Sequence, residues 1–243
     1  MVPLLCPARK NILFDLDGTL LPMDMEQYLR IYIEGLSVQI PDIPPEQMFK
    51  TLWEGIIAMM KNSGEKTNRE VFADVFLART GLDYYAAEEK FLRFYETDYH
   101  NCAASCTKTP LAAQIIETLM QKGYNIVIAT SPLYPAIATQ ARLAWAGLAD
   151  KTYPLVTTFD AFHYAKPNPA YFQEVCERLH VAPQECIMVG NDAEEDGVAR
   201  SIGMEMILVT DCLINKKNLP LEDFRRATLQ DVLLWAQQLP TCV

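Results

Sequence analysis

Two aspartates lie two residues apart directly after a short apolar run near the start of the chain. Asp15 and Asp17 belong to the stretch Asp-Leu-Asp-Gly-Thr, and residues 11–15 before and at the first aspartate are typical of a short buried strand. Carboxylates at this spacing can converge on one ion and one electrophile if the chain turns directly after the strand. Taken alone, the pattern also fits an ordinary strand end followed by a turn.

Hydroxyl groups and a lysine follow later in the chain. The strand-like run at residues 125–129 leads into Thr130 and Ser131, where hydroxyls and backbone amides at a helix start suit a phosphate oxygen. Such residues are also commonplace helix caps. Lys166 stands just before a helix that Pro169 helps to start, although a lone lysine is usually a solvated surface charge.

A second group of carboxylates follows another strand-like run. Residues 185–189 lead into Gly-Asn-Asp, which places Asn191 and Asp192 at the strand end, and Asp196 lies four residues further on. Acidic residues in the first turn of a helix are also favoured by the helix dipole, so this segment alone decides little.

Strand-like and helix-like runs alternate in most of the chain. The expected strands cover residues 11–15, 125–129, 152–156, 185–189 and 205–209, and the expected helices cover residues 110–122, 133–146, 168–180 and 194–202. This alternation predicts an α/β fold with a doubly wound parallel sheet covered by helices on both faces. Ligands bind outside the carboxyl ends of the strands in such sheets, and the polar residues above follow strand ends.

Residues 22–100 have a different pattern, with apolar residues at helical spacing and no convincing strand. Proline and glycine residues separate the expected helices. We therefore expect a core domain formed by residues 1–21 and 101–243, with a smaller helical domain of residues 22–100 inserted after the first strand.

The four polar segments together resemble the signature motifs of the haloacid dehalogenase superfamily in order and spacing. The helical insert is similar to the α-helical cap of that superfamily, so the resemblance covers essentially the whole chain. It implies a Rossmann-like core and a phosphatase that acts through an aspartyl-phosphate. In that reading Asp15 attacks phosphorus, Asp17 protonates the leaving oxygen and later deprotonates water, and Thr130 and Lys166 bind the phosphoryl oxygens.

The resemblance also implies Mg²⁺ as the cofactor. Its expected ligands are Asp15, the backbone carbonyl of Asp17, and Asp192, with Asp196 holding Lys166 or a metal-bound water. Many relatives place the metal-binding aspartate directly after the glycine, where this chain has Asn191. Asn191 as the ligand in place of Asp192 is therefore the alternative.

Other reactions occur in the same superfamily. Dehalogenases resemble this pattern but lack the second aspartate, so Asp17 argues against them. A sugar-phosphate mutase or a phosphonate hydrolase is the alternative, although no histidine lies on the first helix of the insert and none of Lys50, Lys61 and Lys66 stands out as a Schiff-base lysine. A catalytically idle protein that binds a metabolite is less favoured, because the aspartates and Lys166 are present.

Composition excludes several partners. The chain has 31 acidic and 21 basic residues, a formal net charge of −10, and no run of basic residues, so nucleic acid is an unexpected partner. We expect no membrane span and no signal peptide, and free cysteines in a cytoplasmic enzyme. The expected partner is a small phosphorylated metabolite, whose identity the sequence does not specify.

Overall fold

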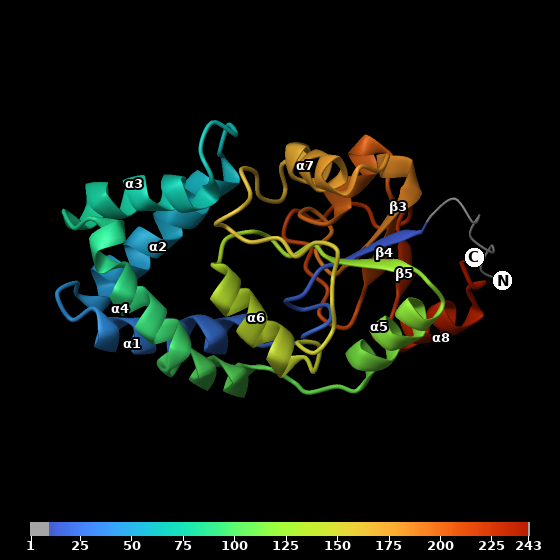
Figure 1. Cartoon of the computed structure of the whole chain (residues 1–243), viewed down its shortest axis with the longest axis horizontal. Coiled ribbons are helices and arrows are strands. Elements are labelled where there is room, and N and C mark those ends of the chain that lie inside the picture. Colours follow the sequence, from blue (N-terminus) through green and yellow to red (C-terminus); the bar gives the residue numbers. More distant parts are fainter. Residues whose placement is uncertain (1–9, 243) are drawn as a thin grey trace.

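The computed structural model describes residues 10–242 of the chain, and its centre is a parallel β-sheet. In the described part the sheet has five strands in the order β2-β1-β3-β4-β5. Figure 1 shows the sheet in the right half of the molecule. The strands are β1 (Asn11–Phe14), β2 (Asn125–Ile128), β3 (Cys186–Gly190), β4 (Glu205–Val209) and β5 (Arg225–Ala227). The prediction of an α/β fold with a parallel sheet is confirmed.

Helices cover both faces of the sheet, as the buried apolar strands require. Alternate side chains of β1 illustrate this arrangement: Ile12 and Phe14 pack with α5 (Leu111–Gln121) and α8 (Leu229–Gln238), whereas Leu13 packs with α7 on the opposite face. The opposite face is covered by α7 (Pro169–Leu179) and the 3₁₀ helix η3 (Gly197–Ile202). The short 3₁₀ helix η2 (Pro183–Glu185) leads into β3.

A separate group of helices follows β1 and forms the left half of the molecule in Figure 1. It contains α1 (Met25–Gln39), α2 (Pro45–Met60), α3 (Asn68–Thr80) and α4 (Tyr84–Glu96). Their starts are encoded locally: Thr67 and Glu70 form a capping box for α3, and Asp24 caps α1. These helices share a hydrophobic cluster that includes Phe76 and Phe94 and extends to Ala138 and Ala141 of the core. We call this group the cap.

The cap is joined to the sheet by two neighbouring crossings. Met23 and Cys106 form an antiparallel bridge, and the Asp24 amide donates to the Ser105 carbonyl at 2.9 Å. The predicted boundary after residue 100 falls inside the 3₁₀ helix η1 (Asp98–Ser105), which packs against α1 and α4. The division into two domains stays a prediction. Residues 1–9 of the predicted core domain lie outside the described part.

The cap also touches the core at the start of α3. The backbone N–H of Asn68 donates to the Phe162 carbonyl at 2.8 Å. The side-chain amide of Asn68 donates to the Pro132 carbonyl at 3.2 Å. Tyr164 donates its hydroxyl to the Ser63 carbonyl at 3.2 Å. Asn68 is fully buried, so this contact holds the cap against the core at a point far from the crossings.

Three predicted elements differ from the structure. Residues 152–156 do not form a strand: only Val156 pairs, through an isolated bridge to Ile128, because Pro154 has no amide proton for a ladder. The helix expected at residues 133–146 is α6 (Ala136–Trp145), which begins after Pro135. The helix expected at residues 194–202 is the 3₁₀ helix η3. Strand β5 and helix α8 were not predicted.

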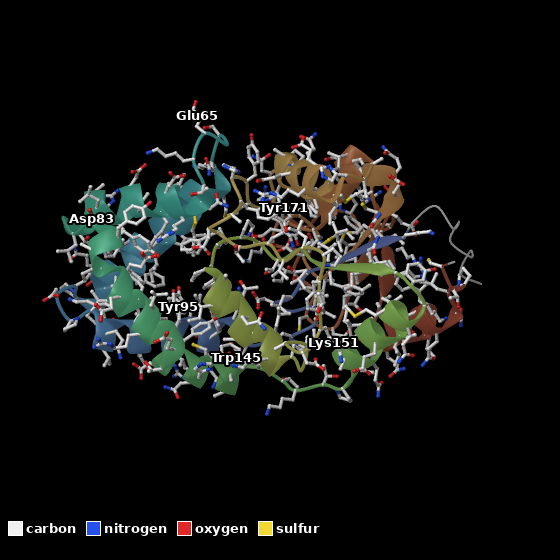
Figure 2. The ribbon with its side chains drawn as sticks, in the orientation of Figure 1. Glu65, Asp83, Tyr95, Trp145, Lys151 and Tyr171 are labelled. Carbon is white, nitrogen blue, oxygen red and sulfur yellow. The ribbon has the colours of Figure 1, made fainter. Side chains whose placement is uncertain are left out.

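Figure 2 shows the side chains that fill the space between these layers, with Tyr171 inside the core and Tyr95 inside the cap. Trp145, at the end of α6, packs against Tyr99 of η1 with ring centroids 5.1 Å apart, so α6 belongs to the contact between cap and core. None of the helices in residues 10–242 is both long enough and apolar enough to span a bilayer.

Candidate active site

Asp15 lies at the carboxyl end of β1, which is flanked by β2 and β3 in the sheet. Its amide donates to the Val189 carbonyl at 2.9 Å, which fixes the backbone at the strand end. Its carboxylate is held from both sides: Lys166 Nζ donates to Oδ1 at 2.9 Å and the Thr19 hydroxyl donates to Oδ2 at 3.2 Å. The Asp15 side chain is therefore buried in a fixed orientation at the carboxyl end of β1.

Lys166 connects two of the predicted segments. Its side chain is 1% exposed, and Nζ also donates to Asp196 Oδ1 at 2.6 Å. Burial lowers the pKa of Lys166, but Asp15 and Asp196 together raise that pKa well above its usual value. Burial raises the pKa of Asp196 to about 6, against the lowering by Lys166. Lys166 is therefore a buried cation shared by two carboxyl groups, not a surface charge.

Asp17 has a partner that the sequence did not indicate. Its Oδ2 forms an ion pair with Arg142 Nη1 from α6. The Arg142 side chain is 1% exposed; Nη2 donates to the Thr139 hydroxyl at 3.1 Å, and the guanidinium carbon lies 4.4 Å from the centroid of the Tyr134 ring. Helix α6 thus fixes the direction of the second aspartate.

Burial is the largest influence on the pKa of Asp17 and raises it above its usual value, while Arg142 lowers it. Among the described residues, Asp17 Oδ1 and the Ser131 hydroxyl are buried without a hydrogen-bond partner. Buried polar atoms are normally hydrogen-bonded, and exceptions commonly mark a place for a ligand or an ion. Both atoms come from segments that the sequence assigned to the site.

Thr130 and Ser131 follow β2, next to β1 in the sheet. Thr130 is 2% exposed, and its backbone carbonyl accepts from the Tyr171 hydroxyl at 3.0 Å. This bond ties the loop after β2 to helix α7, whose N-terminal side carries Lys166. The predicted phosphate-binding residues therefore come from loops that meet at the carboxyl ends of the strands.

The segment after β3 places its two candidate ligands differently. Asn191 is 2% exposed, and its Oδ1 accepts from the Thr19 hydroxyl at 3.0 Å, the same hydroxyl that reaches Asp15. A Cβ atom on Gly18, which has φ +83°, would lie 2.4 Å from the Asn191 side chain, so glycine permits this close approach. Asp192 instead uses Oδ1 to accept from the amides of residues 194 and 195, at 2.8 and 2.9 Å.

Side-chain oxygen atoms of Asp15 and Asn191 gather around the Thr19 hydroxyl, and such oxygen atoms suit a hard cation. In the described part of the chain, no three histidine, cysteine, aspartate or glutamate side chains gather as a metal cluster. However, Asp15 Oδ2 and Asn191 Oδ1 both lie within 3.2 Å of the Thr19 hydroxyl. Carboxylate, amide and backbone carbonyl oxygens are the donors that Mg²⁺ accepts, so the residues fit this ion.

Sequence reasoning missed Thr19, Arg142 and Glu195. Thr19 stands inside the first motif and could have been found there. Arg142 gives no signal in the sequence, because an arginine in an amphipathic helix usually faces water. Glu195 is half-buried near Lys166 and Asp192, and burial raises its pKa to about 8.

Comparisons with known proteins relate the chain to hydrolases and phosphatases. A family model described as haloacid dehalogenase-like hydrolase matches residues 9–203. A glyceraldehyde 3-phosphate phosphatase from Methanopyrus kandleri is 29% identical over 197 residues, which cover 77% of each chain. A phosphoglycolate phosphatase from Rhodospirillum rubrum is 24% identical, over 83% of this chain and 79% of that one.

Solved structures show the same fold. The crystal structure of a phosphatase of this family from Thermococcus onnurineus superposes with a TM-score of 0.58 at 23% identity, and the match covers 95% of this chain and 99% of that one. The family match spans more than half of the 243 residues and includes all the residues that meet around Asp15. The chain belongs to the haloacid dehalogenase-like hydrolase family.

Proposed function

We propose that this hydrolase is a Mg²⁺-dependent phosphatase that cleaves a small phosphate monoester through an aspartyl-phosphate on Asp15. The observation that carries the proposal is the buried Lys166 ammonium, which lies 2.9 Å from Asp15 and 2.6 Å from Asp196. A carboxylate can approach a phosphate dianion only if nearby positive charge offsets the repulsion. Lys166 provides that charge directly beside the nucleophile.

The first chemical step forms a bond between an Asp15 oxygen and phosphorus and breaks the bond from phosphorus to the leaving oxygen. Protonated Asp17 gives its proton to that oxygen, and the alcohol departs. In the second step Asp17 takes a proton from water, whose oxygen attacks phosphorus and breaks the bond to Asp15. Inorganic phosphate leaves, and Asp15 is a free carboxylate again.

Thr130, Ser131 and Lys166 are the proposed ligands of the phosphoryl oxygens. The buried Ser131 hydroxyl, which has no partner within residues 10–242, supports a role as donor to a bound anion. Mg²⁺, when bound, would neutralise charge on the phosphoryl oxygens. Asp15, the Asp17 carbonyl and Asn191 are its proposed ligands, with Asn191 preferred to Asp192 because Asn191 shares the Thr19 hydroxyl with Asp15.

The alternative reactions have less support. A phosphonate hydrolase needs a lysine aimed at the substrate, but Lys50, Lys61 and Lys66 are all exposed. Lys50 pairs with Glu46, and Lys66 pairs with Asp74. Nothing in the cap favours a sugar-phosphate mutase. The names of the phosphatase relatives support hydrolysis of a small phosphorylated metabolite, and a cytoplasmic location is carried over from the sequence as part of the proposal.

A panel of phosphorylated metabolites assayed for phosphate release with Mg²⁺ tests the proposal. We expect turnover of at least one monoester by the wild type and none by Asp15→Asn, which removes the nucleophile's charge at nearly constant volume. Circular dichroism of both proteins shows whether the variant is folded. Near-normal turnover by a folded Asp15→Asn protein, or no turnover of any phosphate ester by the wild type, would overturn the proposal.

A further inference from the structure

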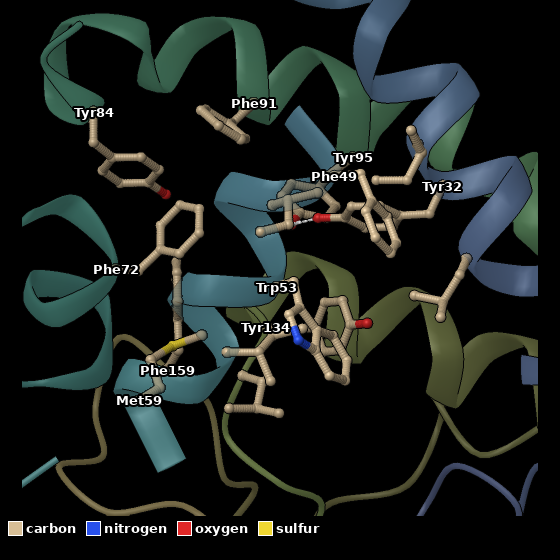
Figure 3. Close-up of a pocket in the computed structure, with 15 residues that line it drawn as sticks. Tyr32, Phe49, Trp53, Met59, Phe72, Tyr84, Phe91, Tyr95, Tyr134 and Phe159 are labelled. Atoms are coloured by element: carbon tan, nitrogen blue, oxygen red, sulfur yellow. Dashed lines mark hydrogen bonds between the residues drawn. The ribbon is translucent and has the colours of Figure 1, made fainter. Parts of the chain in front are cut away.

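The cap contains an apolar cavity of about 80 Å³ that opens between its helices. Figure 3 shows aromatic side chains arranged around this space, among them Tyr32, Trp53, Phe72, Tyr95 and Tyr134. Among the residues that the structure describes, those lining the cavity include no charged side chain. We call this space the cap cavity.

Two hydroxyls of the lining are already paired with each other. The hydroxyls of Tyr32 and Tyr95 bond to one another at 2.7 Å. Burial raises the pKa of both hydroxyls well above the usual value, so the pair stays neutral at physiological pH. A charged or strongly hydrated group placed here would lose its water without gaining a partner, whereas an apolar group would lose little.

The loop after β2 connects the cap cavity with the proposed phosphoryl site. Leu133 and Tyr134 line the cavity, and they follow Ser131 in this loop. The centroid of the Tyr134 ring also lies 4.4 Å from the guanidinium carbon of Arg142, the partner of Asp17. Tyr134 therefore contacts both the cavity and the partner of the proposed acid.

We propose that the cap cavity binds the leaving group of the substrate, and that the preferred substrate is a phosphate monoester whose alcohol ends in a single aromatic ring or an apolar body of that size. This inference rests on the proposed phosphatase activity. It separates the chain from its relatives named for glyceraldehyde 3-phosphate and phosphoglycolate, whose named substrates are short and polar.

The size of the substrate follows from the cavity and its mouth. A closed apolar cavity of about 150 Å³ takes up benzene, so the cap cavity accommodates part of a ring as it stands. Phe49 and Trp53 of α2 line it and are 48% and 52% exposed, so these side chains can turn outward at little cost. The ligand then replaces the contacts that the exposed rings lose.

The test compares 2-phenylethyl phosphate with glycerol 3-phosphate, because both carry primary alkyl alcohols as leaving groups, one ending in an apolar ring and the other bearing two polar hydroxyls. We expect kcat/KM to be at least about tenfold higher for 2-phenylethyl phosphate. Trp53→Ala should remove most of that preference, and it should change kcat/KM for glycerol 3-phosphate much less than kcat/KM for 2-phenylethyl phosphate. Leu77→Ala is the matched control, since Leu77 is 51% exposed on α3 and does not line the cavity.

Equal kcat/KM values for the two substrates, or an equal loss of preference in Leu77→Ala, would overturn the inference. A binding assay separates this failure from failure of the phosphatase proposal. In the inactive Asp15→Asn protein, 2-phenylethanol should shift the tryptophan emission, and the additional Trp53→Phe substitution should abolish the shift. A shift supports the cavity as the ring site even if no ester is hydrolysed, and its absence contradicts the inference whatever the activity.

Discussion

Replacing Asp17 by asparagine should destabilise the fold at a pH at which Asp17 is ionised, because it leaves the Arg142 charge buried without a counter-charge. The Arg142 side chain is 1% exposed, and arginine does not lose its proton in proteins. Breaking a buried ion pair by removing one partner costs about 3–5 kcal/mol. Arg142 keeps the Thr139 hydroxyl at 3.1 Å and the Tyr134 ring at 4.4 Å, so we expect the lower end, about 3 kcal/mol.

Thermal unfolding followed by circular dichroism measures this loss, with chelator present so that metal binding does not contribute. For a chain of this length, about 3 kcal/mol corresponds to a fall in Tm of about 6–12 °C. The matched control is Glu89→Gln on α4. Glu89 pairs with Arg93 at 3.3 Å, but the two side chains are 87% and 62% exposed, so its loss should cost less than about 0.5 kcal/mol.

A second substitution distinguishes the buried charge from a general disturbance of the site. In Asp17→Asn combined with Arg142→Met, the unpaired charge is absent, so the double variant should be more stable than Asp17→Asn alone. A Tm for Asp17→Asn as close to the wild type as that of Glu89→Gln would refute the reasoning. A double variant less stable than Asp17→Asn would refute it as well.

Three further predictions concern the metal and the cap. Chelation of divalent metal should silence turnover and Mg²⁺ should restore it, with Ca²⁺ a poor substitute because it favours looser, higher coordination; full activity in excess chelator would exclude the metal. Asn191→Ala should raise the Mg²⁺ concentration for half-maximal activity by at least about tenfold, while Asp192→Asn should change it little; the reverse order would make Asp192 the ligand. Beryllium fluoride with Mg²⁺ should slow hydrogen exchange in the cap and near Pro22 and residues 101–105. Asn68→Ala should weaken that protection, because it removes the contact with the Pro132 carbonyl. Unchanged hydrogen exchange in the cap would mean that the cap does not close over the site.

The meeting of Asp15 with the segments after β2 and β3 could be predicted, because all three follow strands that a parallel sheet brings together. Asp15 and Lys166 are 151 residues apart in sequence, yet their side chains lie 2.9 Å apart. Lys166 directly follows none of the strands that the structure describes, so its place beside Asp15 was expected only from the resemblance to the family's motifs. The sequence did not predict which of Asn191 and Asp192 faces the site, because these adjacent residues differ only in the direction that the turn gives each side chain.

Other features depend on contacts that local patterns do not contain. Arg142 has an ordinary place in an amphipathic helix, and only the packing of α6 against the first motif buries it beside Asp17. Strand β5 is three residues long and carries two arginines, so it lacks the apolar run that marks a buried strand. Residues 152–156 have that run, but Pro154 prevents a regular ladder.

The central claim is that Asp15 carries the phosphoryl group during turnover. Acid quenching of the wild type during steady-state hydrolysis of a monoester that it cleaves with Mg²⁺, followed by peptide mass spectrometry, tests this most directly. The account predicts one added phosphoryl group on the peptide that contains Asp15, and none in the Asp15→Asn protein treated in the same way. A phosphoryl group on another residue, or continued phosphate release by folded Asp15→Asn, would contradict it.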